Sequence, residues 1–462
     1  MNTNLLTFAS RVGQVEQLYY APVAVIPPPL STPISTFYCF LSHIDPWPDD
    51  QNPPVPTQDM QSFKRVLKSI FVAKQIKSGD ISAVTERINW TENTVYDYYQ
   101  DNIDMFQQNT DGTFVLKFYV KNRYEQIFKC LWNNNGQPST QEPYFEPGAY
   151  GTNNIFVGSD GYKWKYLYTI DLGLKTRFMD ANWIPVPLGG NTPNPISNSA
   201  GYGDIEVINI TNGGHGYNTA NATITVSIVG DGSGATAHVP PEAVTANGQI
   251  TNIVVDNPGA NYTTANVVIT SALGSGATAI SPVSPVGGHG FDNVSDLGVS
   301  RIMFTCTFTG NENGYIPTDI TYRQVGLLFN PTSHSNYING FAGTANGDIY
   351  KATTDLTVAS GFGEYVSDEI LYQTDNTGNT IFSATILSFD PATNVINLIN
   401  IQGTPVLNSP VVGNTTKTVR TLLAVNTPDF VPSGYLAYIE NVTGIQRSSD
   451  GIEQFKFVLR YN

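Results

Sequence analysis

The chain has 462 residues, of which only 13% are charged, and its 23 basic and 38 acidic residues give a formal net charge of −15. This balance disfavours nucleic-acid binding, which needs clustered lysine and arginine for phosphate contacts, and the aromatic fraction of 11% is too high for general disorder. Plentiful glycine, proline and tyrosine, with few strong helix formers, predict a mainly β protein of short strands and turns.

The first predicted strand covers residues 37–44 and ends abruptly at the dipeptide Pro46-Trp47. Three further prolines follow within residues 53–56, and each proline fixes φ and removes a backbone donor. We therefore expect the segment up to Gln58 to leave the sheet as a stiff, extended strap. The simpler interpretation is an irregular surface loop with one buried tryptophan.

The next stretch predicts one helix and several strands. Apolar residues at helical spacing predict a helix over residues 62–76, which Gly79 would end. Strands are predicted over residues 84–90, 114–120 and 126–132.

Residues 160–170 (DGYKWKYLYTI) combine a turn with strict alternation. Alternation places Tyr162, Trp164, Tyr166 and Tyr168 on one face of a strand and the intervening lysines on the other. Such an aromatic face suits either a sugar-binding platform or, more often, a buried core or a protein interface.

An internal repeat begins near residue 200, where the composition shifts to glycine, asparagine and threonine. Residues 205–221 align with residues 250–266, and each copy leads to the sequence Gly-Ser-Gly-Ala-Thr-Ala. Two copies are too few for a solenoid, so we expect a small β-domain of two hairpin-like units. The Gly-rich loops lack the lysine and helix of a phosphate-binding loop.

The remaining segments predict more strands. A second insertion reads as a small barrel, and the C-terminus reads as core strands rather than a free tail. The predicted strands cover residues 301–308, 319–331, 363–366, 382–389, 395–401, 434–441 and 453–459.

We find no catalytic constellation in the sequence. The five histidines form no metal-binding pattern, and no serine lies in a nucleophile elbow. The neighbouring acids Asp49 and Asp50 could suggest a glycosidase or a cation site, but adjacent residues in a strap do not face each other across a cleft. We therefore expect a non-enzyme without metal or cofactor.

Cysteine usage and hydropathy bear on location. Cys39, Cys130 and Cys306 are odd in number and far apart, which suits reduced, buried thiols of a protein folded in a cytoplasm. No signal peptide is predicted, and no apolar run approaches the ~20 residues of a membrane helix.

Four blocks in this order resemble the gene-eight baseplate wedge proteins of contractile-tailed, T-even-like bacteriophages. They are the strap with Pro46-Trp47 and its following prolines; Arg87–Asp97 with Trp90, continuing into 160–170; Tyr322–Pro331 with Arg323-Gln324; and the C-terminal residues 434–459. The resemblance covers residues ~37–188, ~290–332 and ~433–462, within the boundary error of such matching.

The resemblance implies a fold, a partition of the chain and a set of partners. The fold would be a layered antiparallel β-sandwich core with few short helices and two inserted small β-domains. The core would comprise residues 1–198, 287–335 and 432–462, and the insertions residues 199–286 and 336–431. The chain would form a homodimer within each wedge, contact other wedge subunits, and reside in the virion tail baseplate after folding in the bacterial host cytoplasm.

Two functions therefore remain open. The first is a structural wedge subunit that takes part in contraction, without nucleic-acid or membrane partners and with any host-surface contact made through the insertions. The alternative is a carbohydrate-binding or carbohydrate-cleaving tail protein, which would need exposed aromatics and facing carboxylates. The candidate interface or core residues are Pro46, Trp47, Trp90, Tyr162, Trp164, Tyr166, Arg323 and Gln324.

Overall fold

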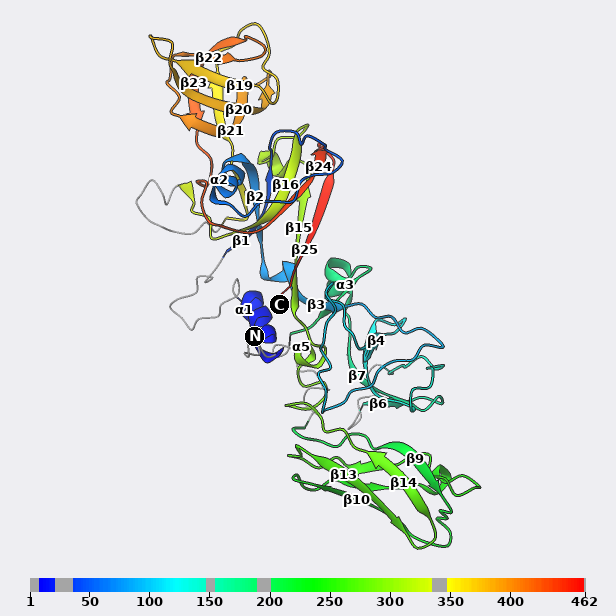
Figure 1. The fold of residues 1–462 in the computed structure, drawn as a ribbon. Coiled ribbons are helices and arrows are strands. Elements are labelled where there is room, and N and C mark those ends of the chain that lie inside the picture. Colours follow the sequence, from blue (N-terminus) through cyan, green and yellow to red (C-terminus); the bar gives the residue numbers. More distant parts are fainter. Residues whose placement is uncertain (1–7, 21–35, 147–153, 189–200, 335–346, 461–462) are drawn as a thin grey trace. The chain divides into compact units, whose positions relative to one another are not determined.

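The computed structural model describes residues 8–20, 36–146, 154–188, 201–334 and 347–460. Its strands pair antiparallel in several sheets and one closed barrel, which confirms the predicted mainly β class. Figure 1 labels the strands and helices along the chain. The chain divides into two compact units. Unit 1 comprises Met1–Gln17, Ser82–Met303 and Val458–Asn462, and unit 2 comprises Leu18–Ile81 and Phe304–Phe457.

The central sheet of unit 2 has the order β17-β2-β1-β16-β24. Strand β1 lies in the middle, between β2 and β16, and all six of its residues are buried. The Phe37 ring packs against Phe304, so a second layer covers this strand. The strands are β1 (Phe37–Ser42), β2 (Ile70–Ile76), β16 (Thr321–Phe329), β17 (Ile349–Lys351) and β24 (Tyr435–Gln446).

The helix predicted over residues 62–76 is wrong in its second half. Helix α2 (Met60–Ser69) begins at the N-cap Asp59, whose side chain accepts from the Ser62 amide, and ends before Ile70. From Ile70 the chain becomes strand β2, since its β-branched and aromatic residues fill the place between β1 and β17. Pairing within the sheet therefore overrides the helical periodicity.

Residues 354–426 form a closed barrel with the order β18-β21-β20-β19-β22-β23, in the part of the chain where the sequence predicts a small barrel. Its core is a continuous apolar cluster that includes Leu356, Ile386 and Leu398. The strand predicted over residues 363–366 is wrong, because Gly363 has a positive φ and Tyr365 instead plugs the core as a loop residue. The strands are β18 (Thr354–Val358), β19 (Ile370–Thr374), β20 (Thr380–Asp390), β21 (Val395–Gly403), β22 (Pro410–Gly413) and β23 (Val419–Asn426).

Unit 1 contains a sheet with the order β4-β5-β7-β6. Strand β7 is buried along seven of its eight residues, so both of its faces are covered. The strand predicted over 114–120 is reduced to β4, which begins only at Tyr119. The strands are β4 (Tyr119–Lys121), β5 (Gln126–Asn133), β6 (Ile155–Val157) and β7 (Tyr162–Thr169).

A further sheet has the order β25-β15-β3-β8. The C-terminal residues form one of its strands, β25, so the predicted C-terminal strand is confirmed. The strands are β3 (Ile81–Glu86), β8 (Trp183–Val186), β15 (Arg301–Thr309) and β25 (Ile452–Arg460), and the helices of unit 1 include α3 (Leu172–Phe178) and α5 (Asn293–Asp296); α1 (Phe8–Tyr20) starts in this unit.

The two sequence repeats exchange strands rather than forming two separate hairpins. Strand β9 of the first copy pairs with β14 after the second copy, and β12 of the second pairs with β11 after the first. Ile208 and Ile253, which are equivalent in the two copies, bridge each other. The strands are β9 (Asn209–His215), β10 (Ile224–Gly230), β11 (Thr236–His238), β12 (Val254–Asn257), β13 (Ala265–Ser271) and β14 (Ser275–Ile280).

Tyr217 and Tyr262, which are equivalent in the two repeats, make matching contacts with the glycine-rich segment that follows the other repeat. Tyr217 packs on Gly274 and accepts a hydrogen bond from the Ala277 amide at 3.3 Å, while Tyr262 packs on Gly232 and accepts from the Ala235 amide at 3.3 Å. A Cβ at Gly274 would lie 2.3 Å from the Tyr217 ring, so glycine is required there by close approach.

All three cysteines are buried and free, as predicted. Burial raises the pKa of the Cys39 and Cys130 thiols well above their ordinary value. These thiols are therefore uncharged core side chains.

Candidate functional site: the proline strap

Residues 43–59, here called the strap, connect the end of β1 to helix α2. The strap contains no regular strand, as its prolines dictate. The strap is nevertheless held in place, because side chains from β16 and β24 form hydrogen bonds with it.

Trp47 fixes the first part of the strap to β24. Its indole Nε1 donates to the Val442 carbonyl at 2.9 Å, across 395 sequence positions, and its backbone amide donates to Asp50 Oδ1 at 2.9 Å. The side chain is half-buried, while the preceding Pro46 is exposed. Trp47 thus anchors a turn whose other face remains in solvent.

Arg323 on β16 holds the middle of the strap. Its guanidinium donates twice to the carboxylate of Asp50, from Nε to Oδ1 and from Nη2 to Oδ2, each at 3.2 Å, and once more to the Ile44 carbonyl at 3.4 Å. This hydrogen bonding holds the pKa of Asp50 below its ordinary value. The fork geometry of arginine suits such a planar, two-point contact.

Gln324 continues the hydrogen-bond chain toward the last prolines. Its Nε2 donates to Asn441 Oδ1 at 2.8 Å, and Asn441 Nδ2 donates to the Pro54 carbonyl at 2.7 Å. Its Oε1 accepts from the Ser42 hydroxyl at 3.4 Å. The amide of Gln324 therefore connects β1, β24 and the strap.

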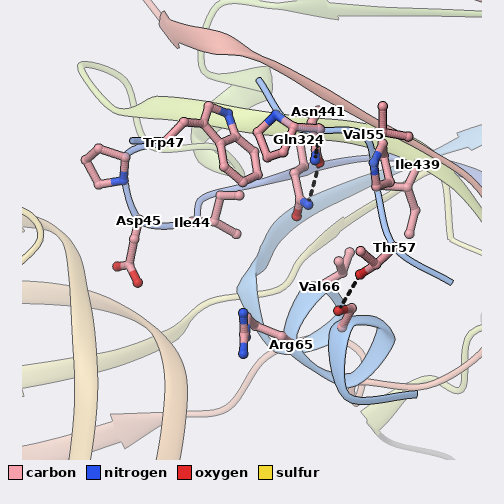
Figure 2. A pocket seen from close by; sticks show the side chains of 14 residues that line it. Ile44, Asp45, Trp47, Val55, Thr57, Arg65, Val66, Gln324, Ile439 and Asn441 are labelled. Carbon is pink, nitrogen blue, oxygen red and sulfur yellow. Dashed lines mark hydrogen bonds between the residues drawn. The ribbon is translucent and has the colours of Figure 1, made fainter. Parts of the chain in front are cut away.

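A pocket of about 280 Å³ lies between the strap, helix α2 and strands β16 and β24. In the view of Figure 2 the Gln324–Asn441 pair lies between Trp47 and Val55. Val55 is 86% exposed, so the mouth of the pocket presents an apolar side chain to solvent. The lining combines apolar side chains with amides, hydroxyls and two charged residues, Asp45 and Arg65, a mixture that suits contact with another protein.

His43 stands where β1 enters the strap. Its ring nitrogens face two oxygens, the Thr321 carbonyl and Asp368 Oδ1, the second at 2.5 Å. The hydrogen bond from His43 lowers the pKa of Asp368. Since Asp368 belongs to the loop before β19, His43 ties the strap to the barrel. The sequence offered no signal for this contact, because the two residues are 325 positions apart.

The paired acids Asp49 and Asp50 do not face each other across a cleft. Asp50 binds Arg323, whereas Asp49 accepts from the Gln51 amide and the Asn52 side chain within its own turn. Among the described residues no group of three or more histidine, cysteine or acidic side chains is placed to hold a metal ion.

The eight candidate residues fall into two groups. Pro46, Trp47, Arg323 and Gln324 meet at the strap in unit 2. The other four lie in unit 1, where Tyr162 and Trp164 are fully buried and Tyr166 is 6% exposed. Trp90 lies at the edge of this group and donates from Nε1 to the Ser139 hydroxyl at 3.0 Å.

The aromatic face of β7 is an interior surface. Tyr162 stacks on Trp164, and Tyr96 meets Trp164 edge-to-face, each at 5.5 Å between ring centroids. The Tyr162 hydroxyl donates to the Gln137 carbonyl at 2.6 Å, and burial raises its pKa to about 12. The predicted strict alternation ends after Tyr166, because Leu167 is an extra residue in the pairing with β5.

No protein-family model and no curated protein sequence matches the chain. Within the described residues no helix is long and apolar enough to cross a membrane.

Proposed function

We propose that this protein is a structural subunit of a phage tail baseplate wedge. It acts by protein–protein assembly and as a rigid part of the contraction machinery, and not as an enzyme. Its partners are a second copy of the chain and other wedge subunits, its location is the virion tail baseplate, and any host contact is made through the inserted domains.

The observation that carries this proposal is the meeting of separate sequence blocks at the strap. Pro46-Trp47, Arg323-Gln324 and Asn441 belong to three of the blocks that resemble the wedge family, and they bind one another directly or through Asp50 and Pro54. A chance resemblance gives no reason for its residues to converge in space. The convergence supports a shared fold and, through it, a shared assembly role.

The burial of the aromatic face argues against carbohydrate binding on that face, which is the alternative function. A sugar platform needs exposed rings, but Tyr162 and Trp164 have no exposed surface. A carbohydrate-cleaving site needs facing carboxylates, and Asp49 and Asp50 are engaged separately. The structural role needs neither feature.

The test is the mass of the purified full-length chain by light scattering, alone and mixed with the other wedge proteins of its phage. We expect a dimer that enters a larger stable complex. A chain that stays monomeric and ignores those proteins would refute the proposal.

A matched pair of variants tests whether the strap surface takes part in complex formation. Val55→Asp places a charge on the pocket mouth, and Val286→Asp places one on an equally exposed valine of unit 1, at 86% and 84% exposure respectively. We expect only Val55→Asp to weaken complex formation. Complex formation by Val55→Asp as tight as that of the wild type would remove the strap from the interface without removing the wedge role.

A further inference from the structure

The second face of β7 carries a row of buried lysines. Lys129 on β5 is paired directly opposite Lys165 on β7, and Lys163 lies two residues before Lys165. Residues paired directly across antiparallel strands, and residues two apart on one strand, share a face of the sheet. The three lysines therefore share a single face, opposite the aromatic one.

Two of these lysines have a buried carboxylate partner. Lys129 Nζ lies 2.7 Å from Asp296 Oδ1, and Lys165 Nζ lies 2.7 Å from Glu206 Oε1. The lysine side chains are each 1% exposed, and those of Asp296 and Glu206 are 2% and 6% exposed. Both charges are thus neutralised inside the protein, as buried charges require.

Lys163 lacks such a partner. It is 8% exposed, and its Nζ donates to the Ile208 carbonyl at 2.7 Å, but no carboxylate of the described residues lies within ion-pair distance. Burial lowers the pKa of Lys163 to about 8, so the ammonium form is held at a cost near neutral pH. An ammonium group has three donors, and one carbonyl does not satisfy them.

A pocket of about 410 Å³ opens beside Lys163. Its neighbours across the sheet, Trp132 and Val157, line the same pocket, and the opposite wall is formed by β9 and residues 249–252 of the repeat domain. The size lies within the range of small-molecule sites. The pocket is therefore bounded by the lysine face on one side and by the repeat domain on the other.

The lining is rich in neutral hydrogen-bonding groups. It includes amides and hydroxyls from both walls, and among the described residues that line it there is no acidic side chain. The nearest acid in sequence, Asp160, uses its Oδ2 to accept from Ser139, Thr140 and Gln141. The polar lining residues are Asn134, Asn135, Ser159, Lys163, Thr211, Gln249, Thr251 and Asn252.

We infer that this pocket binds an acidic sugar residue, with its carboxylate at Lys163 and its hydroxyl groups on the surrounding amides and hydroxyls. An anion would give Lys163 the partner that Lys129 and Lys165 already have. Asparagine, glutamine, serine and threonine supply both donors and acceptors for sugar hydroxyls. The exposed side chain of Val157 supplies an apolar part of the wall. This site is separate from the strap and does not depend on the wedge role.

The test is calorimetric titration of the full-length protein with glucuronate, with glucose and with inorganic phosphate. We expect glucuronate to bind, and glucose to bind about tenfold more weakly because it cannot pair with the ammonium group. Lys163→Met should weaken glucuronate binding about tenfold, whereas Lys163→Arg, which keeps the charge, should largely retain it.

Gln249→Ala provides a second test of the inference. Gln249 lies on the exposed wall of the pocket, where a substitution does not endanger folding. It should weaken glucuronate and glucose alike and leave phosphate binding unchanged. Absence of glucuronate binding at tens of millimolar ligand would overturn the inference, as would equal binding by the wild type and both Lys163→Met and Gln249→Ala. Phosphate binding as tightly as glucuronate would overturn the sugar assignment.

Discussion

The lysine face of unit 1 and the strap of unit 2 both rely on charged contacts, but they place them in opposite environments. Lys129 and Asp296 are enclosed, at 1% and 2% side-chain exposure, whereas Asp50 of the strap is 38% exposed. An enclosed pair must be complete, because a single remaining charge is very costly. A half-exposed pair is solvated when it breaks, so it orients the chain more than it stabilises it. The two regions should therefore respond very differently to the loss of one partner.

The largest effect is expected for Asp296→Asn. The amide can still accept from the Gly290 backbone, which now donates to Asp296 Oδ2 at 2.6 Å, but it leaves Lys129 as an unpaired buried cation. We expect a loss of roughly 3–5 kcal/mol in the free energy of unfolding, measured by urea denaturation. Asp450→Asn, at an exposed position, is the control and should change little.

The same pair predicts an acid sensitivity. Burial alone would raise the pKa of Asp296, but the charge of Lys129 and the hydrogen bond with His289 outweigh it and hold the pKa well below its ordinary value. The pair's stabilisation is therefore present above the unfolded-state pKa of about 3.9 and is lost as the pH falls below it. An acid-denaturation slope equal in wild type and Asp296→Asn would contradict this.

A somewhat smaller effect is expected for Lys163, which shares the lysine face with Lys129 but binds a carbonyl in place of a carboxylate. Its folded-state pKa of about 8 lies below the unfolded value of about 10.4, so the unfolded chain binds more protons between these values. The stability of the wild type should thus rise with pH across this window, by up to about 3 kcal/mol. Lys163→Met should lack this rise when both are unfolded in urea at pH values about 8 and about 10. Parallel curves for the two proteins would show that Lys163 carries no buried charge.

Trp47→Ala tests the strap and should have a moderate effect. It removes a half-buried ring and the hydrogen bond to Val442, which together contribute roughly 1–2 kcal/mol. Trp47→Phe keeps most of the ring and should lose about half as much. Hydrogen exchange should localise the change to residues 43–59; protection lost throughout unit 2 would mean that the strap supports the whole sheet.

The smallest effect is expected for Asp50→Asn. The carboxylate lies at the surface, so water and salt can replace Arg323 as its partner. Thermal unfolding should change only slightly, and less at high salt than at low salt. A loss comparable to that of Asp296→Asn would erase the contrast between the two regions.

Local sequence patterns predicted the elements whose own residue types and spacing favour the structure that they adopt. Alternation located β7 and the C-terminal strand, and the barrel strands β20 and β21 were also predicted. The helix over 62–76 failed at Ile70 because the competing sheet position is supplied by β1 and β17, which the local periodicity does not contain.

The candidate sites show the same limit. Residue motifs indicated Trp47 and Arg323, but only the structure shows that Asp50 joins them. Alternation placed Lys163 on the face of its strand opposite the aromatic one but did not indicate whether that face is covered. In the structure, residues near Ile208 cover Lys163, and no local spacing in the sequence indicates their approach. Burial of a side chain by residues distant in the sequence can be predicted only when the tertiary structure is known.

The position of β1 in the centre of its sheet has a consequence for biosynthesis. Thr36, just before β1, donates to Asn330, 294 positions later, and β16 between them is the strand that completes one side of β1. At a translation rate of roughly 5–20 residues per second, β1 therefore waits on the order of 15–60 s for its neighbour. During that time an apolar strand edge is open to other nascent chains. High expression should thus favour aggregation of incomplete chains, and chaperones that shield such edges should raise the yield of folded protein.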